Sequence, residues 1–496
     1  MGNLNVDQIV PYEIDELQQQ NEKKINQINV TRAFADLPVP FSIYSALEKY
    51  LLMLIIAMIG FWGTVSPPSF FPAIPTIESY FNVSETVANL SVVSYLILQG
   101  VAPTFSSNIS DSIGRRPIVI LCLLIYIGAT IALSQTNVFW LLVLLRCVQA
   151  AGIGPTTSIT AGFSGDICTE ADRGSFVGIV MGMQLTGQAF GSIIGSGLIH
   201  SYGWRGIFVF CAIGSGITLI GVIFLLPETV RSIAGNGSVR PKRVINIAPI
   251  LLLKPFSTRL TNQVETLAPV TQLSLLSPFR ILFRSHIIYV LFSPAIKFAV
   301  WSMTLTSLTL LEGDGYDYSV LKVGYMYLPQ GVTCLIGSVI TGRLLDWSYK
   351  RSKKAYDEKH KHIQESESPG FNILPSRIYI SIIPSVLQFI GIVIFGWCLQ
   401  FKLNIGSIIV GTCLISYSSE AALTISSTVL VDMYPTNASA SVSLMNLTRC
   451  CISALGVGVL SKMTSSMGIG GCYTFWGAVG LVADMVMFYA VCFKKQ

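Results

Sequence analysis

Long apolar stretches alternate with short polar turns along almost the whole chain. Twelve of these stretches have about the 20 residues that an α-helix needs to cross the hydrocarbon core of a bilayer. We expect membrane spans at residues 50–71, 87–106, 117–135, 138–162, 176–198, 206–226, 287–311, 323–342, 378–399, 404–431, 439–461 and 473–492. The pattern therefore predicts an all-α polytopic membrane protein with twelve transmembrane helices.

Polar residues gather in segments outside these spans. Residues 1–47 form an N-terminal tail, and a central segment at 230–286 separates a first six-helix bundle, 48–229, from a second, 287–493. The central segment and a shorter loop at about 345–375 are basic and serine-rich, so we expect solvated linkers. Binding of membrane lipids with anionic headgroups by the lysines of the shorter loop is the alternative.

Composition and charge exclude several classes of protein. The chain has 496 residues, of which 52% are hydrophobic and 12% charged, about half the charge of a soluble domain. Its 11 cysteines show no metal-ligand spacing, and it has no phosphate-binding Gly-Lys-Ser/Thr loop. We therefore expect no metal, no cofactor, no ATP-driven transport and no enzyme activity. The net charge of +6 is modest, and no nucleic-acid partner is expected.

The positions of the basic residues predict the orientation in the membrane. Of the 32 lysines and arginines, 25 lie in the tail, the even-numbered loops, the central segment and the C-terminus. Four lie in the opposite loops and three within spans. Because basic loops stay in the cytosol, both termini are expected to be cytosolic. The tail has no apolar core of a signal peptide, so the first span is expected to direct insertion.

The polar turn after the second span recurs after the eighth. An aspartate, Asp111 or Asp346, follows a small residue by four positions and precedes two cations by four and five positions. The copies read Ser107-Asn-Ile-Ser-Asp111-Ser-Ile-Gly114-Arg115-Arg116 and Gly342-Arg-Leu-Leu-Asp346-Trp-Ser-Tyr-Lys350-Arg351. The repeat indicates a duplicated transporter with two pseudo-symmetric six-helix bundles. The glycine permits a tight turn, and the aspartate can interact with a helix N-terminus and latch one conformation.

This turn resembles the signature loop of the major facilitator superfamily, and further motifs resemble fungal twelve-span drug:proton antiporters of the quinidine-resistance type. They include Arg146-Cys-Val-Gln149, Gly165-Asp166-Ile-Cys-Thr-Glu170, Pro227-Glu228-Thr229 followed by Gly235-Asn-Gly-Ser238, and Asn446-Leu-Thr-Arg449-Cys450. The resemblance covers residues 45–490. It implies that spans one, four, seven and ten line a central cavity. It also implies gating by Asp111, Gly114, Arg115, Arg116, Asp166 and Asp346.

The fifth span departs from the antiporter motif of that family. Ser192 and Ser196 replace a proline and a glycine, which makes the direction of coupling less secure. Gly187, Gly191 and Gly195 remain four residues apart and form a small-residue face for close helix packing.

Ionisable residues within the spans are the main candidates for function. Arg146, Lys297 and Glu420 lie on spans that the resemblance places around the cavity, so we expect them to share one water-accessible space. Glu420 is the candidate proton carrier, because a cation that approaches it in only one conformation would couple protonation to access. We expect Arg449 to serve packing and Asp484 to be peripheral.

Other candidates for substrate contact are polar or aromatic. Gln149, Gln184, Gln188 and Trp301 complete the set of proton-coupling or substrate residues. Aromatic residues at 61–62, 70–71, 301, 325 and 327 predict an aromatic cavity suited to lipophilic cations. Asn82-Val-Ser84 is the sequon expected outside the cell, so Asn82 is the candidate glycan acceptor.

Together these observations predict a monomeric proton-coupled antiporter that exports small organic solutes by alternating access. The resemblance implies quinidine-like cations, polyamines or related metabolites as substrates, and the plasma membrane as the location. A facilitative carrier or symporter is the nearest alternative, and a non-transporting membrane sensor, or a lipid scramblase, belongs to another class. The little apolar patterning in the central segment argues against a sensor domain.

Overall fold

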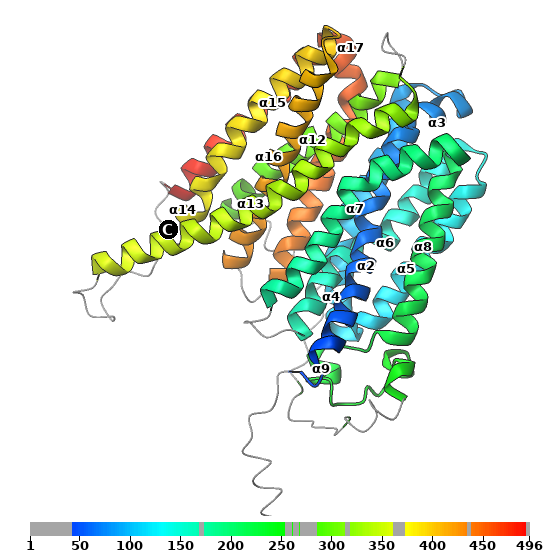
Figure 1. Cartoon of the computed structure of the whole chain (residues 1–496), viewed down its shortest axis with the longest axis vertical. Coiled ribbons are helices and arrows are strands. Elements are labelled where there is room, and N and C mark those ends of the chain that lie inside the picture. Colours follow the sequence, from blue (N-terminus) through cyan, green and yellow to red (C-terminus); the bar gives the residue numbers. More distant parts are fainter. Residues whose placement is uncertain are drawn as a thin grey trace, which may run out of the picture. The chain divides into compact units, whose positions relative to one another are not determined.

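The computed structural model describes residues 42–167, 173–252, 260, 267, 285–312, 318–360, 373–433 and 438–492. The chain divides into Met1–Ile43 and a second unit, Tyr44–Gln496, which contains all the helices discussed below. The described residues are helical or irregular and contain no strand (Figure 1). The predicted all-α class is therefore confirmed.

The first half of the chain forms six long helices. They are α2 (Ala46–Phe70), α4 (Glu85–Ile113), α5 (Arg115–Gln135), α6 (Phe139–Ile167), α7 (Arg173–Tyr202) and α8 (Arg205–Leu225). Short elements follow some of them: η2 (Phe71–Ala73), α3 (Ile74–Phe81), α9 (Arg231–Ala234), η3 (Val244–Asn246) and η4 (Pro249–Leu252). A capping box starts α2, because Ser45 and Glu48 each accept the other's backbone N–H.

The second half contains α12 (Ser285–Ser307), η6 (Leu308–Glu312), α13 (Val320–His360), α14 (Ile373–Ile378), η7 (Tyr379–Ser381), α15 (Ile382–Gln400), α16 (Ile405–Met433) and α17 (Ala438–Cys492). Ten described segments are long and apolar enough to cross a membrane. α7 has the length of a span but is not among these ten. Outward faces are apolar, as on α8, where Ile213, Ile217 and Ile220 recur at helical spacing and are exposed.

The 55 residues of α17 contain two antiparallel segments that meet at Gly468. Gly468 has a φ of 76° and interrupts the helix. Before this break, Arg449 and Gly456 approach Phe298 and Met303, so the first segment runs parallel to α12. After it, Tyr473 contacts Ser307 and Asp484 contacts Lys297, so the second segment runs the opposite way. α17 therefore supplies both the eleventh and the twelfth expected spans.

Helix contacts repeat between the two halves of the chain. In the first half α2 packs on α7, α4 on α6, and α5 on both α6 and α8. In the second half α12 packs on α17, α13 on α16, and α15 on both α16 and α17. The halves meet where α4 packs on α17 and α7 packs on α13. This repetition is the arrangement of two pseudo-symmetric six-helix bundles that the repeated turn predicts.

Prolines in the first span are compensated by side chains from other helices. Pro67 and Pro72 have no backbone N–H, so the carbonyls of Gly63 and Pro68 lose their α-helical donors. Gln99 of α4 donates through Nε2 to the Gly63 oxygen at 3.5 Å. Ser192 of α7 donates through Oγ to the Pro68 oxygen at 2.9 Å. The serine that replaces the family's proline in span five therefore bonds the bent end of span one.

The first part of the central segment is partly buried. Asn246 of η3 is buried and donates through Nδ2 to the carbonyl of Ile113 at the end of α4, at 3.3 Å. Ser238 is buried, and its backbone N–H donates to the Asn236 side chain at 3.2 Å. The expectation of a solvated linker is therefore wrong for residues 234–238, 241, 246 and 248, which are buried, whereas residues 242–245 are exposed as expected. The remainder of the central segment, apart from residues 260 and 267, lies outside the described residues up to 285.

Candidate functional site

A cavity of about 290 Å³ lies between the two halves of the chain. We call the side of the molecule where α4 ends at Ile113 the turn side, and the side where α4 begins at Glu85 the far side. The cavity extends from the middle of the helices toward the turn side. Its lining comes from seven helices: Thr64, Pro103, Thr157, Ser158, Gln184, Leu185, Gln188, Ser338, Glu420, Leu423, Thr424, Ser427, Val442, Ser443, Met445, Asn446 and Arg449.

Close contacts join the two halves beyond this cavity, toward the far side. A Cβ on Gly331 of α13 would lie 2.3 Å from the Ala189 carbonyl oxygen of α7. A Cβ on Gly324, two turns earlier, would lie 2.4 Å from the Ser196 Cβ. Backbone contact this close requires glycine. It leaves no space for a solute to pass between α7 and α13 at this level.

Among the described residues of the cavity lining, the charged ones are Glu420 of α16 and Arg449 of α17. Arg449 donates through Nε to the Asn446 side chain at 2.9 Å, and its Cζ lies 4.6 Å from the centre of the Phe298 ring. None of the described residues donates a hydrogen bond to the Glu420 carboxylate or forms an ion pair with it. Glu420 therefore presents an acceptor to the cavity. We expected Arg449 to serve packing. It also lines the same cavity as Glu420.

Hydroxyl and amide side chains are numerous in the cavity lining, and aromatic side chains are absent from its described residues. Seven of its described lining residues carry hydroxyl groups and three carry amides, whereas none is aromatic. The predicted aromatic side chains lie elsewhere. Trp62 donates to Thr218 of α8 at 2.8 Å, Tyr327 donates to the Leu305 carbonyl at 2.8 Å, and Tyr325 is exposed. The expectation of an aromatic cavity is therefore wrong for the described residues.

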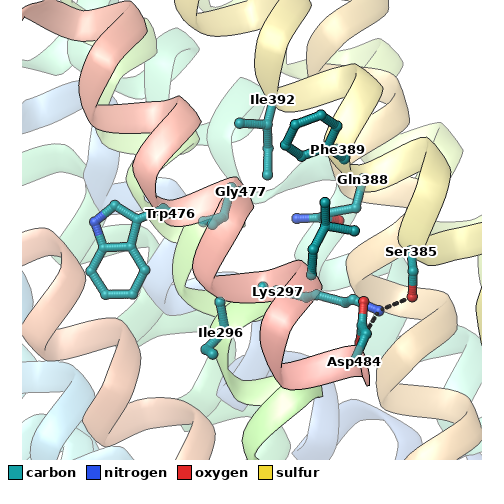
Figure 2. A pocket seen from close by; sticks show the side chains of 12 residues that line it. Ile296, Lys297, Ser385, Gln388, Phe389, Ile392, Trp476, Gly477 and Asp484 are labelled. Atoms are coloured by element: carbon teal, nitrogen blue, oxygen red, sulfur yellow. Dashed lines mark hydrogen bonds and ion pairs between the residues drawn. The ribbon is translucent and has the colours of Figure 1, made fainter. Parts of the chain in front are cut away.

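Lys297 lies outside this cavity, in an ion pair inside the second bundle (Figure 2). Its Nζ is 3.0 Å from Oδ1 of Asp484 and donates to Oγ of Ser385 at 2.8 Å. Ser293 also donates to the same Asp484 oxygen. Both charged side chains are almost fully buried, and the pair joins α12, α15 and α17. The peripheral place expected for Asp484 is therefore wrong, because span twelve turns this carboxylate inward toward span seven.

Arg146 occupies a third environment, within the first bundle. Its Cζ lies 4.0 Å from the ring centre of Phe70 and 4.2 Å from that of Tyr95. It donates to the Gln149 side chain at 2.8 Å, and no carboxylate among the described residues pairs with it. The guanidinium is therefore held by two aromatic faces and an amide. The prediction that Arg146, Lys297 and Glu420 share one space is wrong, because Glu420 lines the cavity whereas Arg146 and Lys297 are buried inside the first and second bundles.

The four uncharged candidates divide between the cavity and the bundle interiors. Gln184 and Gln188 line the cavity, and Gln184 also donates to Thr160 of α6 at 3.1 Å. Gln149 donates to Thr130 of α5 at 3.0 Å and is buried behind Arg146. Trp301 is buried beside Phe298, at 5.3 Å between ring centres, and does not appear among the described residues of the cavity lining.

The glycines of α7 face α2. A Cβ on Gly187 would lie 2.6 Å from Oγ1 of Thr64, and one on Gly191 would lie 2.7 Å from Cγ of Pro68. At Gly195 the Cβ would lie 2.1 Å from the Ser69 carbonyl oxygen. Any side chain at these positions would force the two helices apart. The stripe therefore lets α7 pack directly against the first span.

Gly114 forms the first copy of the repeated turn. Its φ of 125° is rare for residues with a side chain, and a Cβ there would lie 2.4 Å from Oε2 of Glu228. The Glu228 carboxylate accepts the backbone N–H groups of Arg115, Arg116, Thr229 and Val230 at 3.0 to 3.3 Å. It therefore caps the N-terminus of α5 from a distant segment. Burial raises the pKa of Glu228, and these four N–H donors oppose that shift.

Arg115 joins two aspartates in this turn. Its Nη1 is 2.9 Å from Asp111, and its Nε is 2.6 Å from Asp166 at the end of α6. Arg116 donates to the carbonyls of Leu226 at 2.8 Å and Ile223 at 2.7 Å. These described partners belong to the first bundle. The turn therefore ties together the ends of α4, α5, α6 and α8.

In the second copy, the arginine beside the aspartate is not one of the two cations that the repeat suggested. Arg377 of α14 lies 4.0 Å from Asp346 and 3.2 Å from Asp432 at the end of α16. Lys350 and Arg351 remain on α13, which continues to His360. Sequence spacing missed Arg377 because the segment between α13 and α14 separates it from its aspartate.

The candidate glycan acceptor lies on a surface turn. Asn82 is exposed between α3 and α4, with a left-handed φ of 50°, and its backbone N–H donates to the Glu78 carbonyl. Ser84 of the sequon is also exposed. Modification at Asn82 stays a prediction.

The fold and this site define a membrane carrier in which two related helical bundles enclose a cavity that contains a carboxylate and a guanidinium. Residues 50–356 match the family profile of the Major Facilitator Superfamily. The chain belongs to this superfamily, which makes it a multi-pass membrane transporter rather than an enzyme.

Known proteins resemble the chain along most of its length. MFS antiporter QDR2 of Candida albicans is 45% identical over 462 residues, which cover 93% of this chain and 92% of that protein. Quinidine resistance protein 1 of Saccharomyces cerevisiae is 36% identical over 482 residues, which cover 92% and 85%. The solved structure of the xylose transporter XylE from E. coli, in a partially occluded inward-open conformation, has a TM-score of 0.62 at 14% identity. It covers 90% of this chain and 100% of that one, and shows that the fold is shared.

Proposed function

We propose that this protein is a proton-coupled antiporter that exports small organic solutes through the cavity containing Glu420 and Arg449. The observation that carries the proposal is the placement of one carboxylate and one guanidinium in the cavity between the two bundles. In carriers built from repeats, the sites for the solute and the coupling ion lie near the middle of the membrane, at the interface between the repeats. The names of the relatives, an MFS antiporter and a quinidine resistance protein, support the same mechanism.

Glu420 is the residue that we propose to carry the proton. It is the cavity's carboxylate among the described residues, and its neighbours on the lining are hydroxyls, amides and one arginine. Ionisation of a carboxyl group depends on the charges around it and on access of water. A movement that changes the distance to Arg449, or that admits water, would change whether the proton is held. The substrate would use the same acceptor when the proton has left.

The repeated turns are proposed to gate the cavity by keeping each bundle rigid. Asp111, Gly114, Arg115, Arg116 and Asp166 join helix ends within the first bundle. In the second bundle, Asp346 of α13 shares Arg377 of α14 with Asp432 of α16. The two bundles can then rock against each other along the α4–α17 and α7–α13 contacts.

We further propose that the turn side faces the cytosol, as the excess of lysine and arginine indicates. Both termini would then be cytosolic, and the cavity would receive its solute from inside the cell. The plasma membrane, a monomeric state and contact of the basic loops with anionic lipid complete the proposal. Tagging the two termini and finding them on opposite sides of the membrane would overturn the orientation.

Proton movement in proteoliposomes tests the antiport directly. Purified protein would be given an imposed pH gradient, and quinidine, a polyamine and an amino acid would be added in turn. We expect proton flux opposite to the solute in wild type and its loss in Glu420→Gln. Glu358→Gln, on the exposed end of α13, is the matched control for loss of one carboxylate. Coupled flux that persists in Glu420→Gln would remove the proposed carrier.

The same assay separates the alternatives. Solute flux without proton movement would indicate a facilitative carrier, and flux of both in one direction would indicate a symporter. Ser192, which stands where antiporters of this family have proline, keeps both alternatives relevant. A folded protein that moves no solute would favour the membrane sensor.

A further inference from the structure

Asn446 connects the two bundles to the charged residues of the cavity. It lies on α17, is buried, and lines the cavity beside Arg449. Its Nδ2 donates to the carbonyl oxygen of Gln99 on α4 at 3.0 Å. Its Oδ1 accepts Nε of Arg449 at 2.9 Å. One amide therefore holds a backbone of the first bundle and a charged side chain of the second.

The Gln99 carbonyl accepts this bond because α4 contains a proline four residues later. Pro103 has no backbone N–H, so the Gln99 oxygen lacks its α-helical donor. A buried carbonyl without a partner is unfavourable, and more so within a membrane. Asn446 supplies the missing donor from the other half of the chain.

The partners also fix the orientation of the amide. A carbonyl oxygen can only accept, and a guanidinium can only donate. The NH2 group of Asn446 must therefore face Gln99, and its oxygen must face Arg449. Rotation of the side chain by half a turn would oppose donor to donor and acceptor to acceptor. The two hydrogen bonds consequently form together or fail together.

Next to this hydrogen bond, the two bundles are in close contact through α4 and α17. A Cβ on Gly100, next to Gln99, would lie 2.8 Å from Cβ of Cys450 and 3.3 Å from the backbone of Leu447. A shift of α4 along α17 must therefore move the Gln99 oxygen relative to Asn446. A change in the packing of α4 against α17 therefore also changes the hydrogen bond that Asn446 accepts from Arg449.

We propose that Asn446 is a positioning residue, which ties the orientation of Arg449 in the cavity to the packing of α17 against α4. The proposal deepens the proposed function, on which its transport readout rests. Among the described residues that line the cavity, Arg449 and Glu420 are the charged ones. A guanidinium that is fixed in one access state and released in the other would give the carboxylate a different electrostatic environment in each.

The test combines Asn446→Leu, which removes both hydrogen bonds at similar volume, with Pro103→Ala, which returns an N–H donor to the Gln99 carbonyl. Thermal unfolding in detergent would be measured for wild type, both single variants and the double variant. We expect Asn446→Leu to lower Tm by about 2 °C or more, and Pro103→Ala to restore much of that loss. Pro329→Ala, which returns an N–H to α13 instead, is the matched control, and its effect on Tm is expected to be the same with and without Asn446.

Transport separates positioning from simple structural support. In Asn446→Leu, we expect the pH of half-maximal transport to move toward higher pH by about half a unit or more, because a carboxylate that loses a fixed cation releases its proton less readily. The double variant should keep this altered pH profile although its Tm recovers, since Arg449 still lacks its acceptor. Recovery of both properties, or an unchanged profile in Asn446→Leu, would overturn the proposal.

The two readouts also separate this inference from the proposed function. If wild type moves no protons with any solute, the proposed function fails and the transport role of Asn446 fails with it. The Tm rescue then still decides whether Asn446 bonds the two bundles through the carbonyl that Pro103 leaves open. Failure of the rescue in an active antiporter would overturn the cross-bundle contact alone.

Discussion

The two copies of the repeated turn build the same charge arrangement from different parts of the chain. In the first, Arg115 lies 2.9 Å from Asp111 and 2.6 Å from Asp166. In the second, Arg377 lies 4.0 Å from Asp346 and 3.2 Å from Asp432. Each arginine joins aspartates from two helices of its own bundle, at the ends of α4 and α6 in the first copy and within α13 and at the end of α16 in the second. The arrangement is kept although the arginine comes from the turn in one copy and from α14 in the other.

The difference originates at one position, three residues after the aspartate. Gly114 occupies it in the first copy and, with a φ of 125°, ends α4 and begins α5 at once. Tyr349 occupies it in the second copy, and α13 continues as a helix to His360. Arg377 then returns beside α13, with its Cζ 5.1 Å from the Tyr349 ring centre. The residue three positions after the aspartate, more than the cations that follow it, therefore decides which arginine lies between the two aspartates.

The largest effect that tests this comparison is expected from Gly114→Ala. The variant combines backbone strain of about 1–3 kcal/mol with a Cβ placed 2.4 Å from the Glu228 carboxylate. We expect a large fall in Tm, or loss of folded protein during purification. Gly203→Ala is the control, because Gly203 also has a positive φ, of 73°, but its Cβ would meet no atom within 4 Å. Equal losses in the two variants would show that Glu228 does not constrain the turn.

A smaller effect is expected from neutralising the aspartate at the end of α6 or of α16. Asp166→Asn weakens a short ion pair and the bond that Thr229 donates at 3.1 Å, and should reduce stability by about 2 kcal/mol. Asp432→Asn weakens a longer and more exposed pair and should cost about 1 kcal/mol. Denaturation midpoints of both variants would be compared with wild type. A greater loss of stability in Asp432→Asn than in Asp166→Asn would contradict the prediction that the first copy contributes more.

The smallest expected effect is a pH dependence that belongs to the first copy. Burial raises the pKa of Glu228 in the folded protein, so the unfolded chain releases this proton at lower pH. The associated stability is complete below the unfolded pKa of about 4.3 and is lost as pH rises through the raised folded value. The Tm of wild type should therefore fall relative to Glu228→Gln across this window. A constant difference between the two proteins would contradict it.

Sequence alone predicted the fold well because spans are set by hydropathy over many residues. Each of the twelve expected spans coincides with a described helix or with one segment of α17, and the repeated turn indicated the pseudo-symmetry. The expectation for the eighth span is too short at its end, because α13 continues past the apolar stretch into charged residues. The buried residues of 230–252 were predicted poorly, since their burial depends on polar caps such as Asn246 rather than on an apolar pattern.

The candidate site was harder to predict because it depends on which side chains face one another. Sequence identified Glu420 and Lys297 as buried charges, but helix number alone could not show that Asp484 points at Lys297. Asn446 was known only from a motif, and Arg449 was expected to serve packing rather than to line the cavity. The signal that could have found Asn446 is Pro103, since a proline within a span requires a donor from elsewhere.

The bend at the end of the first span also has a consequence for biosynthesis. The Pro68 carbonyl receives its side-chain donor from Ser192, 124 residues later in the chain. At a translation rate of about 5–20 residues per second, Ser192 is made roughly 6 to 25 s after Pro68. During this interval, span one must reside in the membrane before its hydrogen bonding is complete. The ribosome has then to deliver the fifth span before the first can reach its final conformation.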